Sequence, residues 1–224
     1  MPRHNRVDVA GEVYHVVNRA NGREFIFQTD DDYWSVISII EETLKRYPLD
    51  IFSFCIMSNH WHFAVRPREN GDIGKFFGSM TQKVTQRWHA YHHSVGSGHL
   101  FQGRFRSFLV QTDSYFIQLM KYVESNPLRA KMVARAEDWK WSSLHLRLFK
   151  RDLASKILAD WPIEYTGDYV NDINLPMHES FLQQVRHSSA RGTPLGEAGW
   201  IQDVVKKFGL EHTLRQRGRQ FKPK

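Results

Sequence analysis

Two histidines and a late tyrosine are the side chains of this sequence best suited to chemistry. His60-Trp61-His62 lies in a stretch that alternates as a strand does, so both imidazoles should project from one face, spaced to bind one cation, with Trp61 in the core. Tyr122 and Asn126 lie four residues apart at the end of a predicted helix, where Asn126 offers an oxygen ligand on the same face. Each pattern alone also fits ordinary packing, but their conjunction predicts a metal-assisted nucleophilic site.

The reaction that this set of groups fits is nucleophilic phosphoryl transfer. A tyrosine oxygen attacks a backbone phosphorus while a divalent metal polarises the phosphate. Because a phenolate is a better leaving group than an alkoxide, a 3′-hydroxyl can reverse the step and reseal the strand. A phenol with a pKa of about 10 needs help from the metal, a bound water or a nearby base, and the sequence leaves that choice open.

The elements that must position these groups follow the order strand, helix, strand, strand, helix, strand, helix. Runs of β-branched and aromatic residues predict strands at 12–17, 49–58, 60–66 and 105–111. Apolar residues at three- and four-residue spacing predict helices at 30–46, 72–92 and 115–126. The order predicts an α+β fold with a ferredoxin-like split β-α-β-β-α-β antiparallel sheet. Two helices cover one face, and the other face is left for substrate and an additional catalytic helix.

Charge divides the chain into three regions. The net charge of +7 over 224 residues favours a polyanionic partner. Residues 186–224 hold nine Lys and Arg against three acidic residues, whereas residues 151–185 hold two against six. We therefore predict a catalytic domain at 1–150, an acidic connector at 151–185 and a basic DNA-binding extension at 186–224, in which only 197–208 has a helical pattern.

Membrane, secretory and disulfide patterns are not found in the sequence. No apolar run is long enough for a membrane span or follows the first residues as a secretory signal would, so a cytoplasmic protein is predicted. The single cysteine, Cys55, cannot form an internal disulfide, and its apolar neighbours predict a small core residue.

Four segments carry a resemblance to a known family. They are Tyr14–Arg19, Cys55–His62, Gly98–Phe105 and Tyr122–Ala130, and Trp141-Ser142-Ser143 closes the match over roughly residues 1–145. In this order they resemble the single-tyrosine HUH transposases, specifically the REP-associated tyrosine transposases of bacteria. Ser58 stands where relatives often have proline, and Ser125 where they often have an aliphatic residue.

The resemblance implies a role for each group of the predicted site. His60 and His62 correspond to the HUH pair, Asn126 to the third metal ligand and Tyr122 to the nucleophile, with Mg²⁺ or Mn²⁺ as the ion. It further implies a 5′-phosphotyrosine intermediate with a free 3′-hydroxyl. The implied substrate is single-stranded DNA folded as an imperfect REP-like palindromic hairpin with a short flanking guide. Tyr115, seven residues earlier on the same helical face, is the rival nucleophile. A monomer is favoured over a homodimer, and the protein is expected at the bacterial nucleoid.

Candidate DNA contacts are basic or loop residues near the predicted site and in the C-terminal tail: Arg19, Arg23, His99, Arg104, Arg106, Arg215, Arg217 and Arg219. Two other functions fit the charge and the histidine pair. One is a non-catalytic single-stranded nucleic-acid-binding module, which gives Tyr122 no nucleophilic role. The other is a metal-dependent hydrolytic nuclease, which uses activated water and leaves no covalent adduct.

Overall fold

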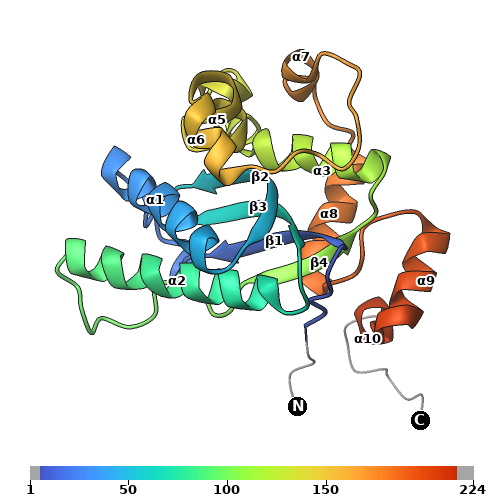
Figure 1. Ribbon diagram of the computed structural model, residues 1–224, viewed down its shortest axis with the longest axis horizontal. Coiled ribbons are helices and arrows are strands. Elements are labelled where there is room, and N and C mark those ends of the chain that lie inside the picture. The colour runs from blue at the N-terminus through green and yellow to red at the C-terminus, as the bar shows by residue number, and fades with distance from the viewer. Residues whose placement is uncertain (1–5, 216–224) are drawn as a thin grey trace, which may run out of the picture.

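A four-stranded antiparallel sheet forms the centre of the molecule (Figure 1), which is a computed structural model that describes residues 6–215. Its strands are β1 (Val13–Arg19), β2 (Leu49–Met57), β3 (His60–Pro67) and β4 (Arg106–Val110). They lie in the order β2-β3-β1-β4, which is that of a split β-α-β-β-α-β fold. The fold class predicted from the sequence is confirmed.

Two helices cover one face of the sheet and a third packs on the other (Figure 1). α1 (Asp30–Arg46) and α2 (Asp72–Tyr91) lie side by side over the first face, where their apolar residues bury Tyr14, Trp61 and Phe63. α3 (Ser114–Glu124) packs on the second face in a separate core that includes Ala64 and Phe108. Because side chains alternate along each strand, this second face receives the polar residues that the sequence singled out.

The predicted third helix ends earlier than the sequence indicated. α3 ends at Glu124, and a short helix, α4, begins at Asn126 and ends at Arg129. Pro127 has no backbone N–H to donate to the Val123 carbonyl four residues earlier, which explains the break, and that carbonyl accepts from Asn126 Nδ2 instead. The prediction that Asn126 lies on the same helix as Tyr122 is therefore wrong, although the two residues remain in contact.

Most of the C-terminal third is helical, which the sequence pattern did not indicate. After the short turns η1 (Asn21–Arg23) and η2 (Ala136–Asp138), the remaining elements are α5 (Ser143–Phe149), α6 (Arg151–Ile157), α7 (Tyr169–Ile173), α8 (Glu179–Arg191), α9 (Ala198–Phe208) and α10 (Glu211–Leu214). Only α9 corresponds to a predicted helix. α8 spans the boundary placed between residues 185 and 186, and its Phe181, Leu182 and Val185 are buried beside α3. None of the helices within residues 6–215 has the length and apolarity to cross a bilayer.

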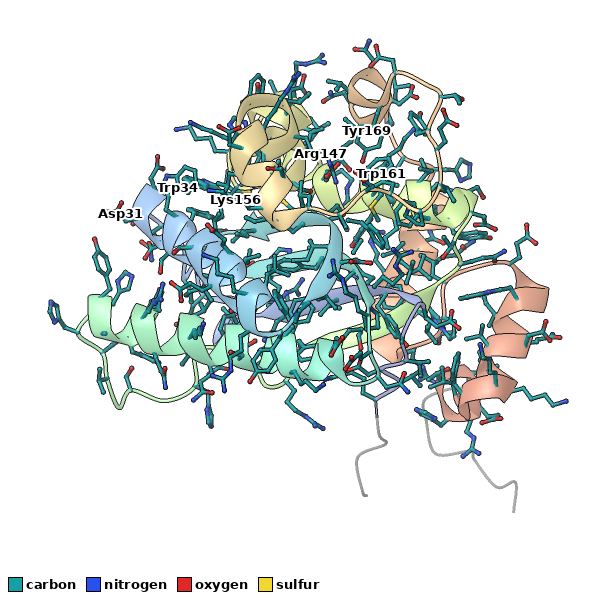
Figure 2. The ribbon with its side chains drawn as sticks, in the orientation of Figure 1. Asp31, Trp34, Arg147, Lys156, Trp161 and Tyr169 are labelled. Atoms are coloured by element: carbon teal, nitrogen blue, oxygen red, sulfur yellow. The ribbon has the colours of Figure 1, made fainter. Side chains whose placement is uncertain are left out.

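A buried carboxylate fastens α3 to these later helices. Glu124 is fully buried, and Arg147 Nη1 of α5 donates to its Oε1 at 2.5 Å. Tyr169 of α7 donates its hydroxyl to Oε2 at 2.7 Å, and the Ser143 hydroxyl also donates to Oε1. Figure 2 shows Arg147, Trp161 and Tyr169 gathered above α3. Helix α3 is thereby held from both sides, by the sheet below it and by the helical cover above it.

Candidate active site

Strand register places the two histidines on the α3 face of the sheet. β1 pairs with β3 so that Val17 lies opposite His62 and Arg19 opposite His60. The His60 and His62 ring centroids are 4.9 Å apart, with the ring planes at 81°. Trp61 is fully buried in the opposite core. The alternation predicted for this strand is confirmed.

A chain of two hydrogen bonds fixes the tautomer of His60. Asn59 Nδ2 donates to the carbonyl of Arg23 at 3.0 Å, so the amide oxygen of Asn59 faces the His60 ring. That oxygen lies 2.6 Å from His60 Nδ1 and can only accept, so Nδ1 carries the proton. The lone pair of His60 is therefore on Nε2, the nitrogen through which His60 could bind a cation while Nδ1–H donates to Asn59.

Burial keeps the imidazoles of this face neutral. It lowers the pKa of His60 to about 4, helped by the positive charges of Arg19 and Arg129. It likewise lowers the pKa of His62 well below the ordinary value, with further contributions from His60 and His15. Near neutral pH both rings are therefore neutral, and each carries one nitrogen lone pair.

Tyr122 extends from α3 toward the histidine pair on the sheet. Its ring centroid lies 5.7 Å from that of His62, edge to face at 87°, and the side chain is almost fully buried. Arg129 holds the tyrosine from the other side, because its guanidinium carbon lies 4.1 Å from the ring centroid and Nη2 donates to the Tyr122 carbonyl at 2.9 Å. The rival, Tyr115, instead packs toward Phe181 of α8, with centroids 6.3 Å apart.

The end of α3 holds the amide nitrogen of Asn126. Its Nδ2 donates to the carbonyls of Tyr122 at 3.0 Å and Val123 at 3.3 Å, at the end of α3. The amide nitrogen is thus engaged by the helix, and Oδ1 points the other way. Asn126 lines the same cavity as His60, His62 and Tyr122.

The donor set fits a divalent cation in type. Two imidazole Nε2 atoms and one amide oxygen are ligands that several divalent ions accept. Within residues 6–215, no cluster of three or more His, Cys, Asp or Glu side chains is placed to hold a metal. Any ion at this site would therefore depend on Asn126 and on oxygen atoms of the substrate or of water to complete its coordination.

A basic cavity of about 490 Å³ surrounds these groups. Within the described chain its lining includes no Asp or Glu. Five arginines line it: Arg19, Arg23, Arg104, Arg106 and Arg186. The first four form no ion pair within residues 6–215, whereas Arg186 pairs with Glu179 at 2.8 Å on the surface. A cavity with this lining attracts anions, and phosphate oxygens above all.

The remaining predicted DNA contacts lie elsewhere. His99 is exposed in the loop after α2 and Arg215 is exposed after α10, and neither lines the cavity. Arg217 and Arg219 lie outside the described residues.

Comparison with known proteins gives the family. The family model described as "Transposase IS200 like" matches residues 9–126, more than half of the chain. The chain belongs to this transposase family. It is 24% identical over 133 residues to a curated REP-associated tyrosine transposase of Haemophilus influenzae, covering 55% of this chain and 73% of that protein. The solved structure of a REP-associated tyrosine transposase bound to a REP hairpin has the same fold, with a TM-score of 0.53 and 21% identity over 75% of this chain and 93% of that one.

The match to the IS200-like transposases ends at Asn126, so it covers the histidine pair and Tyr122 but not every residue at the cavity. Arg186 comes from α8, which was not predicted, although Phe181, Leu182 and Val185 have helical spacing and Gly192 suits a helix end. Sequence reasoning also missed Arg129 as a partner of Tyr122. A third missed residue, His15, lies directly behind His62.

Proposed function

We propose that this transposase-family chain cleaves and rejoins single-stranded, hairpin-forming DNA of the REP type through a tyrosine–phosphate linkage. The observation that carries the proposal is the meeting of Tyr122 with His60 and His62 in one basic cavity, although they come from different elements. The hairpin as substrate is supported by the relative whose structure holds a REP hairpin.

The proposed reaction begins with the Tyr122 hydroxyl and a backbone phosphate seated among the cavity arginines. The tyrosine oxygen forms a bond to phosphorus as the bond from phosphorus to the 3′-oxygen breaks, which leaves a 5′-phosphotyrosine and a free 3′-hydroxyl. The phenolic proton leaves to water, since no carboxylate of the described chain lines the cavity, and the 3′-oxygen takes up a proton. The reverse step, from a 3′-hydroxyl, rejoins a strand.

The chain supplies positioning and positive charge to this reaction. Arg129 stacks on the Tyr122 ring and holds its backbone carbonyl, which limits the directions in which the hydroxyl can move. A divalent ion, Mg²⁺ or Mn²⁺, would be held by His60 and His62 through Nε2 and by Asn126 through Oδ1, and would polarise the scissile phosphate. The arginines that line the cavity neutralise phosphate charge along the bound strand.

We further propose that one chain forms a complete site. Tyr122 is adjacent to the histidine pair of its own chain, so no helix from a second copy is needed to supply the nucleophile. This arrangement favours a monomer over a homodimer that exchanges catalytic helices.

The direct test uses labelled DNA hairpins from the host's own intergenic repeats, Mg²⁺ or Mn²⁺ and denaturing gels. We expect a covalent protein–DNA band with wild type and with Tyr115→Phe, and none with Tyr122→Phe. Cleaved DNA without that band would instead support the hydrolytic nuclease. Tight hairpin binding without any cleavage would support the binding module.

A further inference from the structure

His15 lies behind His62 on the neighbouring strand and does not line the cavity. Its side chain is fully buried, and its ring lies nearly parallel to that of His62, with centroids 5.0 Å apart and planes at 24°. Phe108 of β4 packs on it at 4.9 Å. His15 Nε2 is 2.8 Å from His62 Nδ1, so one of these two nitrogens donates a hydrogen bond to the other.

The direction of this hydrogen bond decides whether His62 can bind a cation. If His62 Nδ1–H donates to His15, the lone pair of His62 is on Nε2. If His15 donates instead, the proton of His62 is on Nε2 and occupies the position that a cation needs. Only the first direction matches His60, whose Nε2 lone pair is fixed through Asn59.

We propose that His15 is a positioning residue that accepts the hydrogen bond from His62 and thereby presents the Nε2 lone pair of His62 to the cavity. This inference rests on the proposed function, in which His62 is a metal ligand. Metal-ligating histidines commonly donate their second N–H to a carboxylate or a carbonyl, which sets the tautomer and the ring orientation. A neutral imidazole does the same without placing a negative charge beside a cavity that must admit phosphate.

The unpaired nitrogen of His15 supports a functional reason for this residue. When Nε2 accepts from His62, Nδ1 must carry the other proton, and Nδ1 is buried with no hydrogen-bond partner in the described chain. A buried donor without an acceptor destabilises a fold. Phenylalanine would fill this apolar position without that defect, so packing alone does not account for a histidine.

The test compares His15→Phe and His15→Gln with wild type in the full-length protein. His15→Phe keeps an aromatic ring but no acceptor, whereas the Gln amide oxygen can still accept from His62. Phe108→Leu is the matched control, because it loosens the packing on His15 and leaves the hydrogen bond to His62. Two properties are measured: the dissociation constant for Mn²⁺, from electron paramagnetic resonance of the free ion, and the tautomer of His62, from ¹⁵N NMR of its ring in metal-free protein.

We expect wild type to carry the His62 proton on Nδ1, and His15→Phe to move it to Nε2. Mn²⁺ affinity should fall about 10-fold or more in His15→Phe, by analogy with other partners of metal ligands, and should return in His15→Gln. Unchanged Mn²⁺ affinity in His15→Phe, or an Nε2-protonated His62 in wild type, would overturn the role of His15. If wild type binds no Mn²⁺, the metal-dependent part of the proposed function fails, while the NMR tautomer still decides the role of His15.

Discussion

The buried histidines should make the fold sensitive to acid, and the size of the effect can be worked out. Burial lowers the pKa of His15 to about 3 and that of His60 to about 4, and it lowers the pKa of His62 well below the ordinary value. In the unfolded chain each imidazole titrates near a pKa of about 6.5. At pH 5.5 the unfolded state therefore binds close to one proton at each of these histidines, whereas the folded state binds almost none.

Because the unfolded state binds more protons, stability falls as pH falls from about 6.5 toward the lower pKa values of the folded state. Between pH 7.5 and pH 5.5 each histidine removes on the order of 1 kcal/mol from the free energy of unfolding, so the three together remove a few kcal/mol. Replacing His15 by Phe deletes one contribution, and the variant should lose on the order of 1 kcal/mol less than wild type over this interval.

Urea denaturation at the two pH values, followed by circular dichroism, measures these differences. His99→Gln is the control, since it removes an exposed histidine from a loop and should leave the pH dependence of wild type unchanged. The comparison between variants cancels the titration of groups they share. A pH dependence in His15→Phe equal to that of wild type would refute the conclusion that His15 is buried and neutral.

Three further predictions concern Glu124, Arg186 and the divalent ion. Glu124→Ala leaves the largely buried Arg147 without its carboxylate partner and should reduce the free energy of unfolding by about 3–5 kcal/mol. A loss below about 1 kcal/mol in urea denaturation would contradict the role of Glu124 in holding α3 to the later helices. Arg186→Ala should weaken hairpin binding and reduce the slope of log K against log salt by about 0.7–0.9. Arg151→Ala on α6 is the control and should change neither quantity. Equal effects in the two variants would argue against a DNA path through the cavity. Removal of divalent ions with a chelator should stop cleavage but leave hairpin binding, as measured by gel assays, and cleavage at full rate in chelator would exclude the metal role of His60 and His62.

The sheet and the helices of the first half could be predicted because their signals are local. Alternation along 60–66 is enough to put His60 and His62 on one face and Trp61 on the other. α1 begins and ends at the predicted residues, and its start is fixed because Thr29 caps it and the Asp32 side chain accepts from the Thr29 backbone. Order and type of elements then indicate the fold, because few topologies accommodate that sequence of strands and helices.

The rest of the site depends on contacts between distant segments. Strand alternation puts His15 on the face of Val17 and Arg19, but its contact with His62 follows from the register that sets Val17 opposite His62. Arg186 reaches the cavity because α8 docks beside β4, and no local pattern specifies that docking. The acidic connector at 151–185 stays a prediction. Three of the six acidic residues there lie on helices that also bury apolar side chains: Asp152 on α6, Asp172 on α7 and Glu179 on α8.

Locating the DNA on the protein after cleavage tests most directly whether Tyr122 is the nucleophile. Trypsin separates the two candidate tyrosines, because cleavage after Arg106, Lys121 and Arg129 yields one peptide that contains Tyr115 and another that contains Tyr122. Wild type is incubated with a hairpin and Mn²⁺, digested with trypsin and nuclease, and examined by mass spectrometry. We predict a nucleotide attached through a 5′-phosphate to Tyr122 in the peptide 122–129. Attachment to Tyr115, or cleaved DNA with both tyrosines unmodified, would contradict the central claim.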